Sequence, residues 1–167
     1  MRDLIIVGGG VGGLVTASVA AQLGLRVTLV EKSPRLGGDC LRCGCVPSKT
    51  FIKSAKVASL MRRGGDFGLP SCRPEVALAG VNERVRAVIA TIEAHDDPER
   101  LRELGVEVLF GEARFCNPYE IAIKGQRLRA RRFVIATGSR PAVPAIPGLE
   151  EVDYWTNEDV FDQTRLP

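Results

Sequence analysis

The sequence predicts an α/β protein in which a parallel sheet is followed by a small antiparallel β-meander. Three observations lead to this class. Short runs of apolar, β-branched residues alternate with stretches whose apolar residues recur at helical spacing. Toward the C-terminal half this alternation gives way to short strands separated by Asn-Pro and Lys-Gly turns. The composition, 45% hydrophobic and 26% charged, is that of a folded domain and not of a disordered chain.

Composition also limits the partners. The chain has 167 residues, for which one ordinary domain is the default, and a formal net charge of +3. This charge is too small to suggest a nucleic-acid partner. The arginines between Arg127 and Arg132 mostly alternate along strands, as residues on a solvated face do. We therefore expect no nucleic acid to bind.

The N-terminal run from Leu4 to Leu23 carries no charge, and a membrane span or a signal peptide would explain it. The run instead divides into two patterns. Leu4–Val7 has the composition of a buried parallel strand, and an Ala-rich helix ending at Gly24 follows a cluster of glycines. Such a cluster is a poor start for a spanning helix. We expect no membrane association and a cytoplasmic protein.

The glycine cluster has the spacing Gly8-x-Gly10-x-x-Gly13, the fingerprint of dinucleotide binding. Gly8 permits the tight turn, Gly10 lets the backbone touch a pyrophosphate, and Gly13 lets the helix pack closely on the strand. The helix N-terminus offers N–H groups to the phosphates. A second strand at residues 26–30 leads to Glu31, where an acid would hold ribose hydroxyls and disfavour a 2′-phosphate. The sequence thus predicts a Rossmann-like βαβ unit.

Three of the five cysteines, Cys40, Cys43 and Cys45, fall in one short segment; Cys72 and Cys116 lie elsewhere. On a regular helix Cys40 and Cys43 share a face, whereas a Cys40–Cys45 bridge requires a distorted turn, which the intervening glycine permits. A zinc site would need a fourth ligand, and the single histidine, His95, is distant in sequence. We expect no metal site, and we interpret His95 as structural. The spacing alone leaves the pairing open.

Residues 37–47 match the motif G-G-x-C-x-x-x-G-C-x-P at every fixed position, and Ser48 and Lys49 continue it. Here the sequence resembles the class I pyridine nucleotide–disulfide oxidoreductases, which include dihydrolipoamide dehydrogenase, glutathione reductase and mercuric reductase. The resemblance implies bound FAD and a redox-active Cys40–Cys45 disulfide. It gives Cys45 the place against the flavin, as a charge-transfer thiolate, and gives Cys40 the exchange with substrate. Lys49 would approach the flavin N5 edge.

Two residues depart from this pattern. Cys43 is an additional thiol at a variable position, where it either competes for pairing or is inert. Asp39 stands where relatives often have Thr or Ser, and an acid beside a phosphate is unfavourable unless it faces away or caps the helix. These departures put the substrate branch in doubt. The resemblance over Cys45 to Lys49 favours the branch of dihydrolipoamide dehydrogenase and mercuric reductase.

The remaining segments read as two helices, at 48–63 and 75–104, the second with a break around Asp97-Pro98. A strand at 106–110, a meander at 112–115, 119–123 and 126–130, and a buried strand at 132–136 follow. The resemblance implies a second flavin contact at Ala136–Gly138 and an adenine contact at Glu112 and Ala113. The cofactor-binding residues expected in all are Gly8, Gly10, Val11, Gly12, Gly13, Glu31, Lys32, Gly38, Asp39, Lys49, Glu112, Ala113, Ala136, Thr137 and Gly138.

The resemblance implies a domain plan and a reaction. Residues 1–140 would form a FAD-binding domain that lacks its C-terminal strand, and 141–167 a connector toward an NAD(P)-binding domain. Electrons would pass from NAD(P)H through FAD to Cys40–Cys45 and then to a small-molecule or metal-ion substrate, in a full-length homodimer. Only one G-x-G-x-x-G occurs in the chain, so we expect weak or no turnover from it alone. The alternative is a non-catalytic nucleotide-binding or thiol/metal-binding module.

Overall fold

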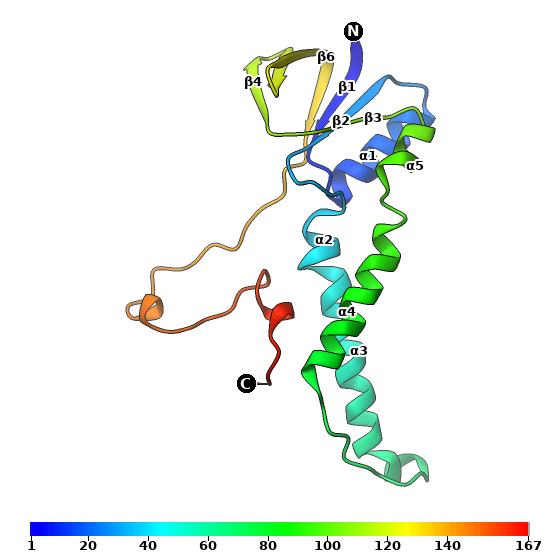
Figure 1. Cartoon of the computed structure of the whole chain (residues 1–167), viewed down its shortest axis with the longest axis vertical. Helices are drawn as coiled ribbons and strands as arrows, with labels where there is room; N and C mark the ends of the chain where they lie inside the picture. Colours follow the sequence, from blue (N-terminus) through cyan, green and yellow to red (C-terminus); the bar gives the residue numbers. More distant parts are fainter. Residues whose placement is uncertain (167) are drawn as a thin grey trace. The chain divides into compact units, whose positions relative to one another are not determined.

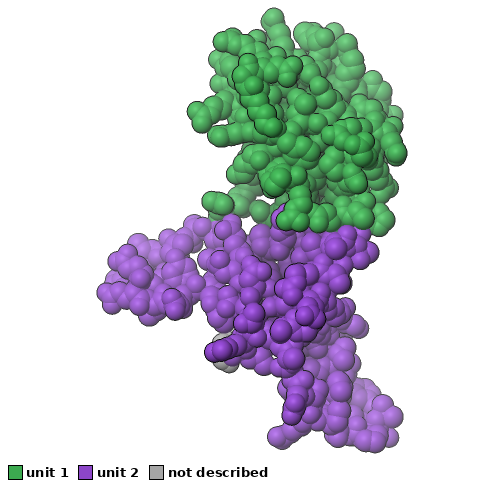
Figure 2. All heavy atoms as spheres, in the orientation of Figure 1, with its two compact units in different colours: residues 1–40, 92–140 green, residues 41–91, 141–167 purple. Residues whose placement is uncertain are grey.

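The computed structural model describes residues 1–166, which fall into two compact units. Unit 1 consists of residues 1–40 and 92–140, and unit 2 of residues 41–91 and the stretch from 141 onward (Figure 2). Unit 1 holds the whole sheet, and unit 2 holds the long helices α3 and most of α4.

Unit 1 is built on a six-stranded sheet with the order β3-β2-β1-β6-β5-β4 (Figure 1). Its strands are β1 (Arg2–Val7), β2 (Val27–Glu31), β3 (Glu107–Phe110), β4 (Ala113–Asn117), β5 (Glu120–Ile123) and β6 (Gln126–Ile135). β1 pairs in parallel with β2 and β6, β2 pairs in parallel with β3, and β4 and β5 form antiparallel pairs. The predicted α/β class, a parallel sheet with an antiparallel meander, is confirmed.

One strand differs from the prediction. The segments expected at 126–130 and 132–136 are a single strand, β6, which changes partner along its length. Gln126 pairs antiparallel with Ile123, whereas Ile135 pairs in parallel with Val7. No turn residue interrupts the arginines between the two halves, so the backbone continues extended. The expectation of a buried second half is wrong at its end, because the side chain of Ile135 is 69% exposed.

The sheet carries one apolar cluster on each face because successive side chains of a strand point to opposite sides. Ile6 and Leu29 pack with helix α1 (Val11–Gln22) through its small residues Ala17 and Ala20. Ile5 packs on the other face with the meander residues Ile121, Ile123, Leu128 and Ala130. This packing fixes the end of β1, where the glycine loop begins.

The N-terminal parts of β1, β2 and β3 are also linked to one another by polar side chains. Arg2 of β1 donates to Thr28 of β2 at 2.6 Å and to Glu107 of β3 at 2.7 Å, and Thr28 donates to Glu107 at 2.7 Å. Partial burial alone would raise the pKa of Glu107, but the bonds from Thr28 and Arg2 outweigh it and lower that pKa. One carboxylate thus links three parallel strands.

The helices start and end near the predicted points, with two corrections. Helix α3 runs over Cys45–Arg62 and begins three residues earlier than expected, because Pro47 occupies its first turn, where a missing N–H costs nothing. The long helix expected at 75–104 is divided into α4 (Leu78–Glu93) and α5 (Pro98–Glu103). The break is where it was predicted: Asp97 caps α5 by accepting a bond from the Glu99 N–H at 2.8 Å.

Unit 2 is a helical hairpin with short turns. α3 and α4 form its arms, and the Arg84 guanidinium donates to the Thr50 carbonyl at 3.2 Å between them. The 3₁₀ turns η1 (Gly64–Phe67), η2 (Leu149–Glu151) and η3 (Val160–Asp162) and the short helix α2 (Gly38–Arg42), which crosses into unit 1, complete the elements. Across residues 1–166, no helix combines the length and apolar character needed to span a bilayer.

Candidate nucleotide and redox site

The loop between β1 and α1 contains two glycines that the protein itself requires. Gly8 has φ +111°, and a Cβ there would lie 2.2 Å from the Ala136 carbonyl oxygen. A Cβ at Gly13 would lie 1.8 Å from the Gly8 carbonyl oxygen. Both distances are far inside van der Waals contact, so the turn and the packing of α1 on β1 exclude any side chain at these positions.

Gly10 is different, because nothing in the protein requires a glycine there. Its φ is −78°, open to any residue, and a Cβ would have the Gly38 Cα at 3.7 Å as its nearest neighbour. At Gly12 the nearest atom would be the Ala136 Cβ at 4.0 Å. At Gly10 and Gly12 the backbone therefore carries no side chain, although the protein leaves room for one. This is the arrangement that close approach of a diphosphate to the main chain needs.

The same loop presents the N-terminal end of α1. The first helical bond runs from the Leu14 N–H to the Gly10 carbonyl at 2.9 Å, so the N–H groups of Val11, Gly12 and Gly13 have no acceptor within the helix. The first turn contains no acidic residue, and no side chain caps the helix at Gly10. Unpaired N–H groups and the positive end of the helix dipole together suit an anionic group.

The glycine pair of the cysteine motif lies against this loop. Gly10 and Gly37 form a parallel bridge, and the Gly37 N–H donates to the Gly9 carbonyl at 2.9 Å. Gly38 has φ +57°, and a Cβ there would lie 2.7 Å from the Gly10 Cα. From the sequence, Gly38 was expected only to bind the cofactor. The structure shows that its lack of a side chain also lets the two loops meet.

Glu31, at the end of β2, stabilises the glycine loop through its carboxylate. Its side chain is buried, and its two carboxylate oxygens accept bonds from the Gly9 N–H at 2.5 Å and from the Ser33 N–H at 2.7 Å. The motif does not predict this structural role, since it indicates a ribose contact alone. Each oxygen keeps a second acceptor direction, so the carboxylate retains the capacity to bind ribose hydroxyls. Lys32, the next residue, is exposed.

The end of β6 completes the group of loops in unit 1. Ala136 contacts the Gly8 position, and Gly138, at φ +72°, would place a Cβ 3.3 Å from the Asp39 Oδ2. Asp39 is exposed in the first turn of α2, and Thr137 is exposed beside Gly138. The predicted residues from the glycine loop, the cysteine motif and the end of β6 are thus brought together, although they are far apart in sequence.

The segment predicted to contact adenine lies at the end of β3. The Gly111 N–H donates to the Glu31 main-chain carbonyl at 2.7 Å, which holds this segment beside the end of β2. Ala113 packs against the core cluster around Ile5. The Glu112 side chain is 70% exposed, and its nearest ionic partner is Arg114 at 3.5 Å. Backbone and not side chain therefore connects this segment to the site.

Two of the three cysteines in this segment lie in helices, and the third lies in the turn between them. Cys40 is half-buried in α2, Cys43 is half-buried in the turn that follows, and Cys45 is the first residue of α3. Cys45 is exposed as a thiol and is not buried in aliphatic packing, which would have been incompatible with a redox role. Lys49 lies one turn further along α3 and is also exposed.

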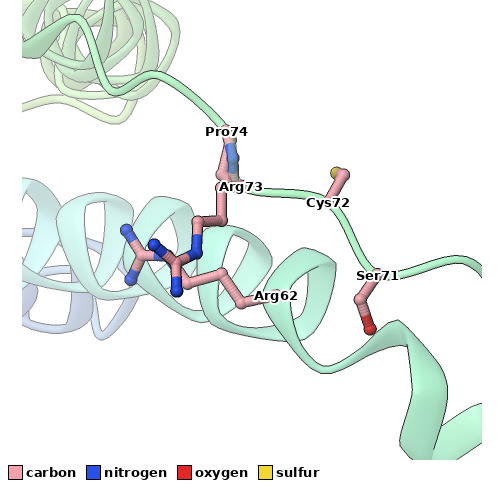
Figure 3. A pocket seen from close by; sticks show the side chains of 5 residues that line it. All are labelled: Arg62, Ser71, Cys72, Arg73 and Pro74. Atoms are coloured by element: carbon pink, nitrogen blue, oxygen red, sulfur yellow. The ribbon is translucent and has the colours of Figure 1, made fainter.

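A cavity of about 630 Å³ in unit 2 is lined by Arg62, Ser71, Cys72, Arg73 and Pro74. In Figure 3 the side chains of Arg62 and Arg73 extend toward the same side, whereas the sulfur of Cys72 points away from them. The Ser71 hydroxyl accepts a bond from the Gly65 N–H at 2.9 Å. None of these residues was predicted as a site residue. Among residues 1–166 no group of three or more His, Cys, Asp or Glu side chains gathers as a metal site would.

The sheet order and the glycine loop define a Rossmann-type α/β protein of the kind that carries dinucleotides. A protein-family model described as pyridine nucleotide-disulphide oxidoreductase matches residues 2–167. The chain belongs to this family of oxidoreductases, which confirms the resemblance drawn from the cysteine motif.

Individual relatives agree with this family. Mercuric reductase from Staphylococcus aureus is 33% identical over 165 residues, which cover 99% of this chain and 30% of the relative. Dihydrolipoyl dehydrogenase from Acholeplasma laidlawii is 41% identical over 153 residues, 89% of this chain and 44% of the relative. The chain therefore spans less than half of the length of these relatives.

A solved structure shows the same fold. The HOCl-induced flavoprotein disulfide reductase RclA from Escherichia coli superposes with a TM-score of 0.79 at 24% identity, covering 99% of this chain and 35% of that chain. At this level of identity the likeness concerns the fold alone.

Proposed function

We propose that this chain is the FAD-binding part of a disulfide oxidoreductase whose redox pair is Cys40 and Cys45. The observation that carries the proposal is the contrast within the glycine loop. Gly8 and Gly13 are required by the protein's own packing, whereas Gly10 has room for a side chain and no backbone need to lack one. A bare backbone beside unpaired helix N–H groups, in a family of this kind, indicates a bound dinucleotide.

We expect the following roles for individual residues. The N–H groups of Val11 and Gly12 would bind the diphosphate, and Glu31 the ribose. FAD, when bound, supplies a carrier that accepts two electrons from NAD(P)H and passes them to a disulfide. Cys45, with Lys49 one turn away, would lie on the flavin side of that disulfide, and Cys40 on the substrate side.

With a small disulfide as substrate, Cys40 and Cys45 would carry out the whole thiol–disulfide exchange. The Cys40 thiolate attacks one substrate sulfur, forming a mixed disulfide and releasing the first thiolate. The Cys45 thiolate then attacks the Cys40 sulfur, which releases the second thiolate and re-forms the Cys40–Cys45 disulfide. Two electrons leave the cysteine pair and reduce one substrate disulfide. With a metal ion, the same pair would bind the ion as thiolates.

The names of the relatives support both substrate classes, a metal ion for mercuric reductase and a dithiol couple for dihydrolipoyl dehydrogenase. The substrate class, NAD(P)H as donor, a homodimeric full-length enzyme, a cytoplasmic location and the lack of nucleic-acid binding remain predictions. So does the weak or absent turnover of this chain alone, because it spans less than half of its relatives.

Flavin binding can be tested directly. The chain is refolded or purified with excess FAD, separated from free flavin, and its visible absorbance compared with its protein content. We expect about one flavin per chain. A protein that stays colourless at high flavin concentration, while its circular dichroism shows a folded α/β domain, would overturn the proposal.

A further inference from the structure

We propose that residues 156–163, here called the docking segment, position the turn between the two redox cysteines, and that Asn157 is the positioning residue. The inference rests on the proposed function, since it concerns the Cys40–Cys45 disulfide. All of the contacts that carry it lie within unit 2.

The turn before Cys45 is held at two successive carbonyls. The Gly44 carbonyl accepts bonds from the Ser48 N–H at 3.1 Å and from the Ser48 hydroxyl at 2.6 Å. The preceding carbonyl, that of Cys43, accepts a bond from the Asn157 Nδ2 at 3.4 Å. Ser48 belongs to α3 itself, whereas Asn157 comes from the other end of the chain. The turn is therefore fixed from both sides.

The docking segment is folded on itself and holds Asn157 in place. Asp159 accepts bonds from the Thr156 hydroxyl at 2.7 Å and from the Thr156 N–H at 3.2 Å. The Gln163 side-chain amide donates to the Asp159 carbonyl at 3.1 Å, across η3. Asn157 lies inside this closed turn, so the entropy cost of orienting its side chain is smaller than on a flexible tail.

Two contacts fasten the segment to the helical hairpin. The rings of Phe161 and Phe51 of α3 meet edge to face, with centroids 5.6 Å apart and planes at 63°. Asn82 of α4 is only 2% exposed and donates through Nδ2 to the Gln163 carbonyl. The Oδ1 of Asn82 is buried and has no hydrogen-bond partner among residues 1–166. If the segment left, the whole amide would be unpaired, so its departure is costly.

The consequence concerns the stability of the disulfide. A bridge from Cys40 to Cys45 requires an irregular turn, and ordering that turn costs conformational entropy. By holding the Cys43 carbonyl, Asn157 contributes part of this order before the bond forms. Loss of the bond should therefore favour the dithiol over the disulfide.

The test is the equilibrium constant for Cys40–Cys45 disulfide formation against a reference dithiol, measured by mass spectrometry on the chain loaded with flavin. We expect Asn157→Ala to lower this constant by about two- to fivefold, the effect of one exposed hydrogen bond. Phe161→Leu, which loosens the segment at its other end, should shift it in the same direction. Asn117→Ala is the matched control, because it also removes one exposed side-chain bond, from the Tyr119 N–H at 2.9 Å, but in unit 1.

Two results would overturn the inference. In the first, the wild-type chain forms the disulfide and Asn157→Ala and Asn117→Ala both leave its equilibrium constant unchanged; the proposed function then stands and the positioning role fails. In the second, the wild-type chain forms no Cys40–Cys45 disulfide at all. That result removes the proposed redox pair and the positioning role with it.

Discussion

At the scale of single residues, the glycines of one motif serve different purposes. The motif predicts a different role for each of Gly8, Gly10 and Gly13, and the structure shows what each of them faces. Gly8 and Gly13 face main-chain atoms of the protein, and Gly10 faces open space. A substitution at Gly10 should therefore act on the ligand, and one at Gly13 on the fold.

The first prediction uses this difference. Gly10→Ala should leave the free energy of unfolding of the flavin-free chain within about 1 kcal/mol of wild type, yet weaken flavin binding by tenfold or more, because its methyl group occupies the space a diphosphate needs. Gly13→Ala, the control, should lose about 1–3 kcal/mol of stability through overpacking. Urea denaturation and flavin titration measure the two effects. Equal flavin affinity in Gly10→Ala and wild type would show that no diphosphate lies there.

Glu31 gives the second prediction. Both of its oxygens accept main-chain N–H bonds in a buried position. Glu31→Gln keeps the size but replaces one acceptor by a donor, so one N–H loses its partner. We expect the free energy of unfolding to fall by about 1–3 kcal/mol without flavin present. Glu112→Gln, at an exposed carboxylate, should leave it unchanged. A Glu31→Gln chain as stable as wild type would contradict the supporting role.

At the scale of elements, the start of β1 is held by ion pairs. The bond from the Arg26 side chain, with a second from its backbone N–H, lowers the pKa of Asp3 from 3.8 to about 2. The Asp3 Oδ2 lies 3.0 Å from the Arg26 guanidinium, at the beginning of β2. In the unfolded chain this carboxyl titrates near its ordinary pKa, so the folded state gains from its ionised form.

The third prediction follows from the sign of that shift. Because the folded pKa is the lower one, the stabilisation from Asp3 is present above its unfolded pKa and is lost progressively as the pH falls from about 5 through the folded value of about 2. Asp3→Asn should flatten the dependence of Tm on pH between these values, and the two proteins should converge at the acid end. Thermal melting from pH 2 to pH 6 checks this. If the difference in Tm between wild type and Asp3→Asn is as large at pH 2 as at pH 6, the proposed linkage is excluded.

The elements also show what local sequence can predict. β1 and β2 were predictable from their short apolar, β-branched runs, and α1 from its Ala-rich composition between the glycine cluster and Gly24. The break before α5 was predictable from Asp97 and Pro98. The continuity of β6 was not predictable, because a change of pairing partner does not alter the residue pattern along the strand. The start of α3 at Cys45 was missed because proline in the first turn resembles a helix break.

At the scale of the whole molecule, the predicted site residues came from four separate segments: the glycine loop with Glu31, the cysteine motif, residues 112–113 and residues 136–138. Only the resemblance implied that these segments meet. The contact of Gly38 with Gly10 and the bond from the Gly9 N–H to Glu31 are long-range, and no periodicity in the sequence predicts them. Asn157 carries no motif at all, so its bond to the Cys43 carbonyl could be found only in the structure. The chemistry of the site thus rests on a prediction from the sequence, whereas the contacts that hold its parts come from the structure.

The central claim is that a flavin lies beside the Cys45 thiolate. The most direct test is the long-wavelength charge-transfer absorbance of the flavin-loaded chain, with one cysteine of the pair removed at a time. Cys40→Ser leaves Cys45 as an unpaired thiolate and should show the band, whereas Cys45→Ser should lack it. The absence of this absorbance from Cys40→Ser at alkaline pH, in a protein with full flavin content, would contradict the account.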